Sequence, residues 1–135
     1  MKDTQNRVLA VSSITPIVGN NTTEGTGTGV DLAGCEGAQL IAQIGASGDT
    51  LSGSVYLTVG WQESDVEGSG YADIAAADLT GGDDGVVIDD AAEDAVVVQR
   101  GYIGSKRYVR AYIAFTGTHT NGTPISALVV KHYLR

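Results

Sequence analysis

The residues best suited to binding chemistry lie in one stretch, residues 99–117 (QRGYIGSKRYVRAYIAFTG). The stretch contains four of the chain's eight basic residues and four of its seven Tyr and Phe residues. The basic residues are Arg100, Lys106, Arg107 and Arg110. Guanidinium and ammonium groups pair with carboxylates, and arginine also stacks on aromatic rings. No acidic residue occurs in this stretch or after Asp94. The pattern therefore predicts a contact with a carboxylate-bearing surface.

The nucleophilic and general-base residues show no catalytic spacing. His119 and His132 are well separated in sequence, and neither has an obvious carboxylate or thiol partner. Cys35 is the only cysteine and cannot form an internal disulfide, so a quiet structural thiol is favoured over a nucleophile. The sequence contains no triad, metal-ligand spacing or nucleophile elbow. We therefore expect a protein that is not an enzyme and that needs no cofactor.

An acidic segment covers residues 80–95, TGGDDGVVIDDAAEDA. Its carboxylates offer the oxygen ligands that calcium prefers. Their spacing does not match the D-x-[DN]-x-[DN]-G loop of calcium-binding helix pairs. A solvated acidic loop is the favoured interpretation, with a calcium site as the alternative.

The basic stretch itself is predicted to form a strand with one buried face. From Tyr108 onward, small and apolar residues alternate with polar and aromatic ones. The period of two predicts that one set faces the core, namely Val109, Ala111, Ile113 and Phe115. The other set, Tyr108, Arg110 and Tyr112, is left free to meet a partner. Gly101 and Gly104 predict a turn just before this strand.

Other segments carry the same strand signals. Residues 38–46 and 54–62 alternate, and Trp61 lies in the apolar register of the second segment. Residues 125–133 predict a final strand, which we expect to form a hairpin with residues 105–115 through the polar loop 116–122. The alanine-rich segment 71–79 predicts one or two turns of helix.

These elements predict an all-β fold and a single domain over residues 1–135. We expect an antiparallel β-sandwich or jelly-roll-like barrel of about seven or eight short strands with little helix. Residues 1–20 include Pro16, which lacks the N–H of a central strand. This segment is therefore expected to be an edge strand or an extended N-terminal arm that lies on a neighbouring molecule.

Charge is distributed unevenly along the chain, whose formal net charge is −8. Residues 1–94 hold all sixteen acids and two bases, giving −14, whereas residues 95–135 hold six bases and no acid. This polarity suits head-to-tail contact between copies, or acidic and basic strands that alternate within one sheet. The overall acidity argues against nucleic acid as a partner. No apolar run is long enough for a membrane span, and the N-terminus is a poor signal peptide.

Several short motifs resemble a family of small tailed-phage proteins that are commonly encoded near the major capsid protein gene. The most specific motif is GYIGSKRYVRAYI at residues 101–113. Shorter motifs are GVDL at residues 29–32, WQESD at 61–65 and YADI at 71–74. The resemblance extends over most of the chain from Gly29 onward, while the acidic segment near residues 81–94 is fuller than the family pattern.

This resemblance implies a structural role in the virion, after synthesis in the host cytoplasm. It implies a decoration or cement protein that binds the major capsid protein on the outside of the head and stabilises the shell. Copies of the chain are expected to associate, with a homotrimer as the attractive state. The residues expected at the capsid or subunit contact are Arg100, Lys106, Arg107, Tyr108, Arg110 and Tyr112. The alternative is a head spike that binds receptors or carbohydrates, with Tyr56, Tyr108 and Tyr112 stacking on sugar rings.

Overall fold

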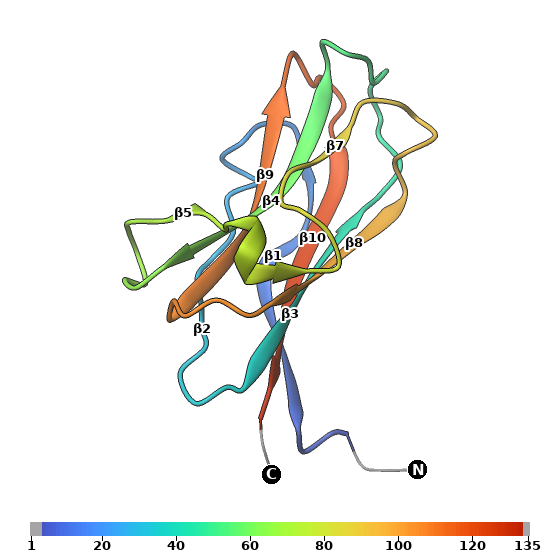
Figure 1. Ribbon diagram of the computed structural model, residues 1–135. Helices are drawn as coiled ribbons and strands as arrows, with labels where there is room; N and C mark the ends of the chain where they lie inside the picture. Colours follow the sequence, from blue (N-terminus) through green and yellow to red (C-terminus); the bar gives the residue numbers. More distant parts are fainter. Residues whose placement is uncertain (1–3, 134–135) are drawn as a thin grey trace.

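The computed structural model describes residues 4–133 as a sandwich of two β-sheets without an α-helix (Figure 1). The strands are β1 (Val8–Gly19), β2 (Val30–Asp31), β3 (Gly37–Ile44), β4 (Tyr56–Ser64), β5 (Ala72–Asp73), β6 (Leu79–Thr80), β7 (Val86–Ile88), β8 (Val96–Tyr102), β9 (Tyr108–Thr116) and β10 (Thr123–His132).

The strands form two antiparallel sheets of five strands each. Sheet A has the order β1-β10-β3-β8-β6. Sheet B has the order β2-β9-β4-β5, and β7 pairs with the same edge of β4 as β5 does. The predicted all-β antiparallel sandwich is confirmed. The predicted number of seven or eight strands was too low, because β2, β5, β6 and β7 are too short to show a period of two in the sequence.

The core lies between the sheets and is built by the predicted alternation. Six inward side chains of β4 and β9 are no more than 1 % exposed; they are Leu57, Val59, Trp61, Val109, Ala111 and Ile113. Sheet A meets them with equally buried side chains from β3, namely Leu40, Ala42 and Ile44. Burial of such side chains on both inner faces is the main force that holds the sheets together. Phe115, which was also predicted to face the core, packs against it but is only partly buried.

The predicted hairpin between the last two long strands is wrong. β9 pairs with β2 and β4 in sheet B, whereas β10 pairs with β1 and β3 in sheet A. The loop at residues 117–122 therefore crosses from one sheet to the other. Gly117 and Gly122 lie at its two ends with φ angles of 82° and 81°, a left-handed conformation that glycine adopts without strain. An Asn-Gly turn signal does not distinguish such a crossing from a hairpin.

The N-terminal segment forms the edge strand of sheet A. β1 pairs with β10 of the same chain from Val8 to Gly19, with register irregularities between Ser12 and Ile17. Residues 1–3 of the predicted arm lie outside the described residues. The expected edge position of Pro16 is confirmed, since β1 has only one neighbour in the sheet.

A loop closes the side of the sandwich where β1 and β9 approach each other. Ser13 of β1 donates a hydrogen bond to the Thr28 carbonyl (3.0 Å) and accepts one from the Ala111 N–H of β9 (2.9 Å). The Gly27 N–H also donates to the Ala111 carbonyl (2.9 Å). Ser13 therefore links β1 of sheet A to β9 of sheet B.

The segment from 71 to 95 is mostly extended. The predicted turns of helix reduce to a single 3₁₀ turn, Ala76–Asp78, between β5 and β6. The predicted acidic loop contains the short strand β7. These corrections reflect short segments whose backbone conformation is decided by their pairing with β4 and β8.

Candidate functional site

The predicted contact residues do not form one surface. Tyr108, Arg110 and Tyr112 lie on the outer side of β9 in sheet B, whereas Arg100 lies on β8 in sheet A. The Arg100 guanidinium donates to the Asp83 carbonyl (3.0 Å) and the Gln99 carbonyl (2.8 Å). Arg100 therefore anchors the acidic loop rather than extending the surface of β9.

Lys106 and Arg107 occupy the loop between β8 and β9, and both are paired within the chain. The Lys106 Nζ lies 2.6 Å from Asp65 Oδ2. Arg107 donates twice to Asp31, at 3.0 and 2.9 Å. The hydrogen bond from Arg107 is the main reason that the pKa of the Asp31 carboxyl falls to about 2. The acidic part of the sequence therefore supplies the partners that the basic stretch lacks locally.

Arg110 is the centre of the polar face of sheet B. Its Nε and Nη2 donate to Gln62 Oε1 at 2.9 and 2.7 Å. Its Cζ lies 4.0 Å from the centre of the Tyr71 ring and 6.0 Å from that of Tyr112. We call the outward side chains Tyr56, Gln62, Tyr108, Arg110 and Tyr112 the arginine–tyrosine face. A guanidinium already covers part of its aromatic surface, and binding of sugars there stays a prediction.

The outer side of sheet A has the opposite chemistry. The pairing registers of β1, β10, β3 and β8 place uncharged side chains in rows across four strands. We call this surface, from the Ala10–Val130 pair to the Val18–Pro124 pair, the neutral face, and its outward residues are Ala10, Ser12, Val18, Gln39, Ile41, Gln43, Val97, Gln99, Pro124, Ser126, Leu128 and Val130. None of these side chains is ionisable, although the chain has 24 acidic and basic residues. The next outward residue of β10, His132, is ionisable and lies beyond this surface.

The neutral face also exposes large aliphatic side chains. The exposed fractions are 56 % for Val97, 54 % for Val18 and 40 % for Leu128. Exposed aliphatic groups gathered on one face mark interaction surfaces more reliably than single ones do. Next to Val18, a shallow groove of about 600 Å³ runs between the end of β1 and β10.

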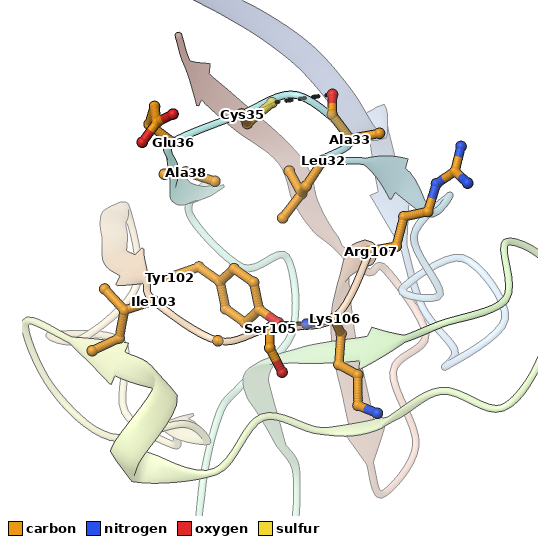
Figure 2. A pocket seen from close by; sticks show the side chains of 12 residues that line it. Leu32, Ala33, Cys35, Glu36, Ala38, Tyr102, Ile103, Ser105, Lys106 and Arg107 are labelled. Atoms are coloured by element: carbon orange, nitrogen blue, oxygen red, sulfur yellow. Dashed lines mark hydrogen bonds between the residues drawn. The ribbon is translucent and has the colours of Figure 1, made fainter. Parts of the chain in front are cut away.

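A second hollow, of about 440 Å³, opens where the loops after β2 and β8 meet (Figure 2). Tyr102 forms its floor, and its hydroxyl donates to Glu63 (2.6 Å) and accepts from the Lys106 N–H (3.0 Å). Burial, followed by the hydrogen bond to Glu63, raises the pKa of Tyr102. Cys35 lies at the rim as a free cysteine. The Tyr102 hydroxyl has both partners within the chain, so its role here is to fix the loop at residues 103–107.

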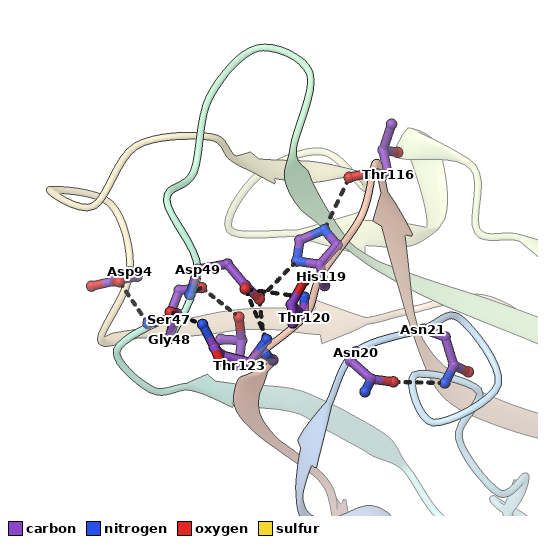
Figure 3. Close-up of polar contacts among 12 residues, drawn as sticks. Asn20, Asn21, Ser47, Gly48, Asp49, Asp94, Thr116, His119, Thr120 and Thr123 are labelled. Atoms are coloured by element: carbon purple, nitrogen blue, oxygen red, sulfur yellow. Dashed lines mark hydrogen bonds and ion pairs between the residues drawn. The ribbon is translucent and has the colours of Figure 1, made fainter.

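A polar cluster joins the loop that follows β3 to the loop that crosses from β9 to β10 (Figure 3). The Asp49 carboxylate accepts hydrogen bonds from the N–H groups of Thr120 (3.1 Å), Asn121 (2.8 Å) and Gly122 (2.8 Å). These bonds, with that of Asn121 as the largest cause, lower the pKa of Asp49. Asp49 also lies beside His119, a pairing that was not predicted because the two residues are 70 positions apart in sequence.

His119 is enclosed beside that carboxylate. Its side chain is fully buried, its Nε2 lies 2.9 Å from the Thr116 carbonyl, and its Nδ1 lies 3.8 Å from Asp49 Oδ2. Nδ1 has no hydrogen-bond partner among the described residues. Phe115 packs edge-to-face on the ring. These contacts, together with those of Asp49, hold the loop at residues 117–122 in place.

Besides the pairing of β7 with β4, the acidic loop contacts sheet B through the carboxylate of Asp84. The Asp84 carboxylate accepts a hydrogen bond from the Trp61 N–H (2.7 Å), in the gap along β4 between β7 and β5. Burial raises the pKa of Asp84. Among the described residues, no group of three or more His, Cys, Asp or Glu side chains is arranged to hold a metal ion.

Comparisons with known proteins do not assign the chain to a family. No protein-family model matches it, and no curated protein is significantly similar to it in sequence. Within residues 4–133, no helix is long and apolar enough to cross a membrane. The surfaces themselves must therefore support any proposal about function.

Proposed function

We propose that the protein is a structural protein of a tailed-phage virion that binds the outer surface of the head and stabilises the shell. The observation that carries the proposal is the neutral face of sheet A. The motifs that resemble those of small phage head proteins are the ground for proposing the major capsid protein as the partner. A long uncharged sheet surface supplies the means of contact.

The neutral face suits a contact that is repeated many times on a shell. Burying uncharged side chains does not require an exact charge partner, whereas burying an unpaired carboxylate or ammonium is costly. The acidic residues lie on loops and on sheet B, so they stay in water when sheet A meets the shell. Weak contacts of this kind gain strength when copies are linked to each other or to several capsid subunits.

The basic stretch has a supporting role in this proposal. Lys106 and Arg107 are already paired with Asp65 and Asp31, so a carboxylate on the shell would have to displace an internal partner. Exposed pairs of this kind contribute little to stability and can exchange partners. Contact through Tyr108, Arg110 and Tyr112, and assembly into a homotrimer, stay predictions.

A matched pair of valines tests the proposed contact. Val97 lies on the neutral face and is 56 % exposed, and Val87 of β7 lies on sheet B and is 47 % exposed. Heads purified from phage that lack this protein are incubated with each variant and sedimented. Val97→Lys should weaken binding by about tenfold or more, since it buries a charge, and Val87→Lys should bind as the unchanged protein does.

Two results would contradict the proposal. If the unchanged protein does not sediment with heads and is absent from purified particles, the virion role is wrong. If Val87→Lys weakens binding and Val97→Lys does not, the protein binds heads through sheet B, and the arginine–tyrosine face is the contact.

A further inference from the structure

We propose that the groove at one end of the neutral face binds a neutral aliphatic side chain from an extended segment of the shell protein. This inference rests on the proposed function, because it names the part of the partner that the neutral face receives. The groove is lined by the end of β1, the start of β10 and Gln43 of β3.

The lining of the groove determines the charge of its occupant. Pro16, Ile17, Val18 and Pro124 supply apolar walls, and no ionisable side chain contributes to the lining. Ile17 and Val18 are 44 % and 54 % exposed, so their apolar surface is available to a ligand. A carboxylate or ammonium in this groove would lose water without gaining an opposite charge. Charge complementarity therefore selects an uncharged, aliphatic side chain.

The edge of β1 argues against the main alternative, in which the partner adds a strand to sheet A. Strand addition needs a regular row of free N–H and C=O groups. Pro16 has no N–H, and the register of β1 shifts twice between Ser12 and Ile17. At the middle of the strand, Thr28 already donates to the Ser13 carbonyl (2.7 Å). Side-chain insertion into the groove therefore fits this edge better than strand addition does.

One polar group is placed to orient the inserted segment. Gln43 is exposed on β3 at the side of the groove. Among residues 4–133, no hydrogen-bond partner is found for its side-chain amide. An amide offers both a donor and an acceptor, which matches the peptide group of an extended chain. Pockets that combine apolar walls with a few such groups bind with defined orientation.

The first test compares a serine of the groove with an exposed serine outside the neutral face. Ser126 lines the groove, whereas Ser69 is exposed in the loop between β4 and β5. Ser126→Phe fills the groove without adding charge and should weaken binding to heads that lack the protein by about tenfold or more, while Ser69→Phe should change it by less than about threefold. Circular dichroism and thermal melting confirm that both variants fold. Equal binding by the two folded variants would overturn the groove proposal.

The second test does not depend on heads. N-acetyl-leucine amide and N-acetyl-glutamate amide are titrated into methyl-labelled protein and followed by NMR. The leucine probe should shift the methyl signals of Ile17 and Val18, the glutamate probe should not, and Ser126→Phe should abolish the shifts. Absence of shifts with the leucine probe overturns the groove proposal, even if heads bind. Shifts in a protein that fails to bind heads support the groove and overturn the proposed function.

Discussion

The outer surfaces of the two sheets differ in charge: that of sheet B carries an arginine among tyrosines, and that of sheet A is uncharged over the neutral face. On sheet B, the arginine–tyrosine face places a guanidinium among rings and amides, and Arg110 has contacts with Gln62, Tyr71 and Tyr112. On sheet A, the neutral face has no charge to satisfy and leaves Val97, Val18 and Leu128 in water.

This difference shows that a residue of a suitable type is not always available to a partner, because it can already be paired within the chain. The basic residues were predicted as the contact because guanidinium and ammonium groups pair with carboxylates. In the fold, Lys106 and Arg107 have carboxylates of their own, at 2.6 and 2.9 Å. The aliphatic residues of the neutral face have no such internal partners, since burying them requires another surface. The less conspicuous residues are therefore the better candidates for an interface.

The largest expected effect comes from breaking the link between the two sheets. Ser13→Ala removes the hydroxyl that accepts from the Ala111 N–H, and leaves that buried N–H without a partner. We expect a loss of about 1–3 kcal/mol in the free energy of unfolding. Ser12→Ala, a change at an exposed neighbour on the neutral face, should stay within about 0.5 kcal/mol. Urea denaturation measures both, and equal losses would show that Ser13 does not join the sheets.

A smaller effect is expected from acid, through the ion pair between Asp31 and Arg107. The pKa of Asp31 is about 2 in the folded protein, below its ordinary value of 3.8, so its contribution to stability is complete above about pH 4 and is lost as the pH falls towards 2. Asp31→Asn should therefore show a smaller decrease in the urea midpoint between about pH 4 and pH 2 than the unchanged protein does. An unaltered decrease would mean that the pair with Arg107 does not form in solution.

The smallest expected effect is that of salt on binding to heads. Raising the NaCl concentration from about 0.05 M to about 0.5 M screens exposed ion pairs but barely affects apolar contacts. Binding through the neutral face should change by less than about threefold over this range. A fall of tenfold or more, measured by sedimentation with heads, would instead identify the basic stretch as the contact.

Local pattern was sufficient for the fold class and for much of the core. The alternation in residues 54–62 and 108–115 predicted which side chains of β4 and β9 are buried, because successive side chains of a strand point to opposite faces. Trp61 was predicted as a core residue and is 1 % exposed. The edge position of β1 followed from Pro16, which cannot serve a central strand.

Pairing between distant segments could not be predicted from the sequence. β9 and β10 look like a hairpin because a turn signal joins them, yet each finds its neighbours elsewhere, at β4 and at β3. The partners of Lys106, Arg107 and His119 come from residues 41, 76 and 70 positions away. Short elements such as β2 and β6 are strands only because β9 and β8 lie beside them.

The sequence by itself determined most of the long strands, their buried sides and the uneven distribution of charge, since these depend on neighbouring residues. Only the tertiary structure decided which strands share a sheet. That choice neutralised the basic stretch with acids from the first half of the chain, and it aligned uncharged residues of β1, β3, β8 and β10 into one surface. The physical reason is register: a surface shared by four strands exists only after their pairing has been set.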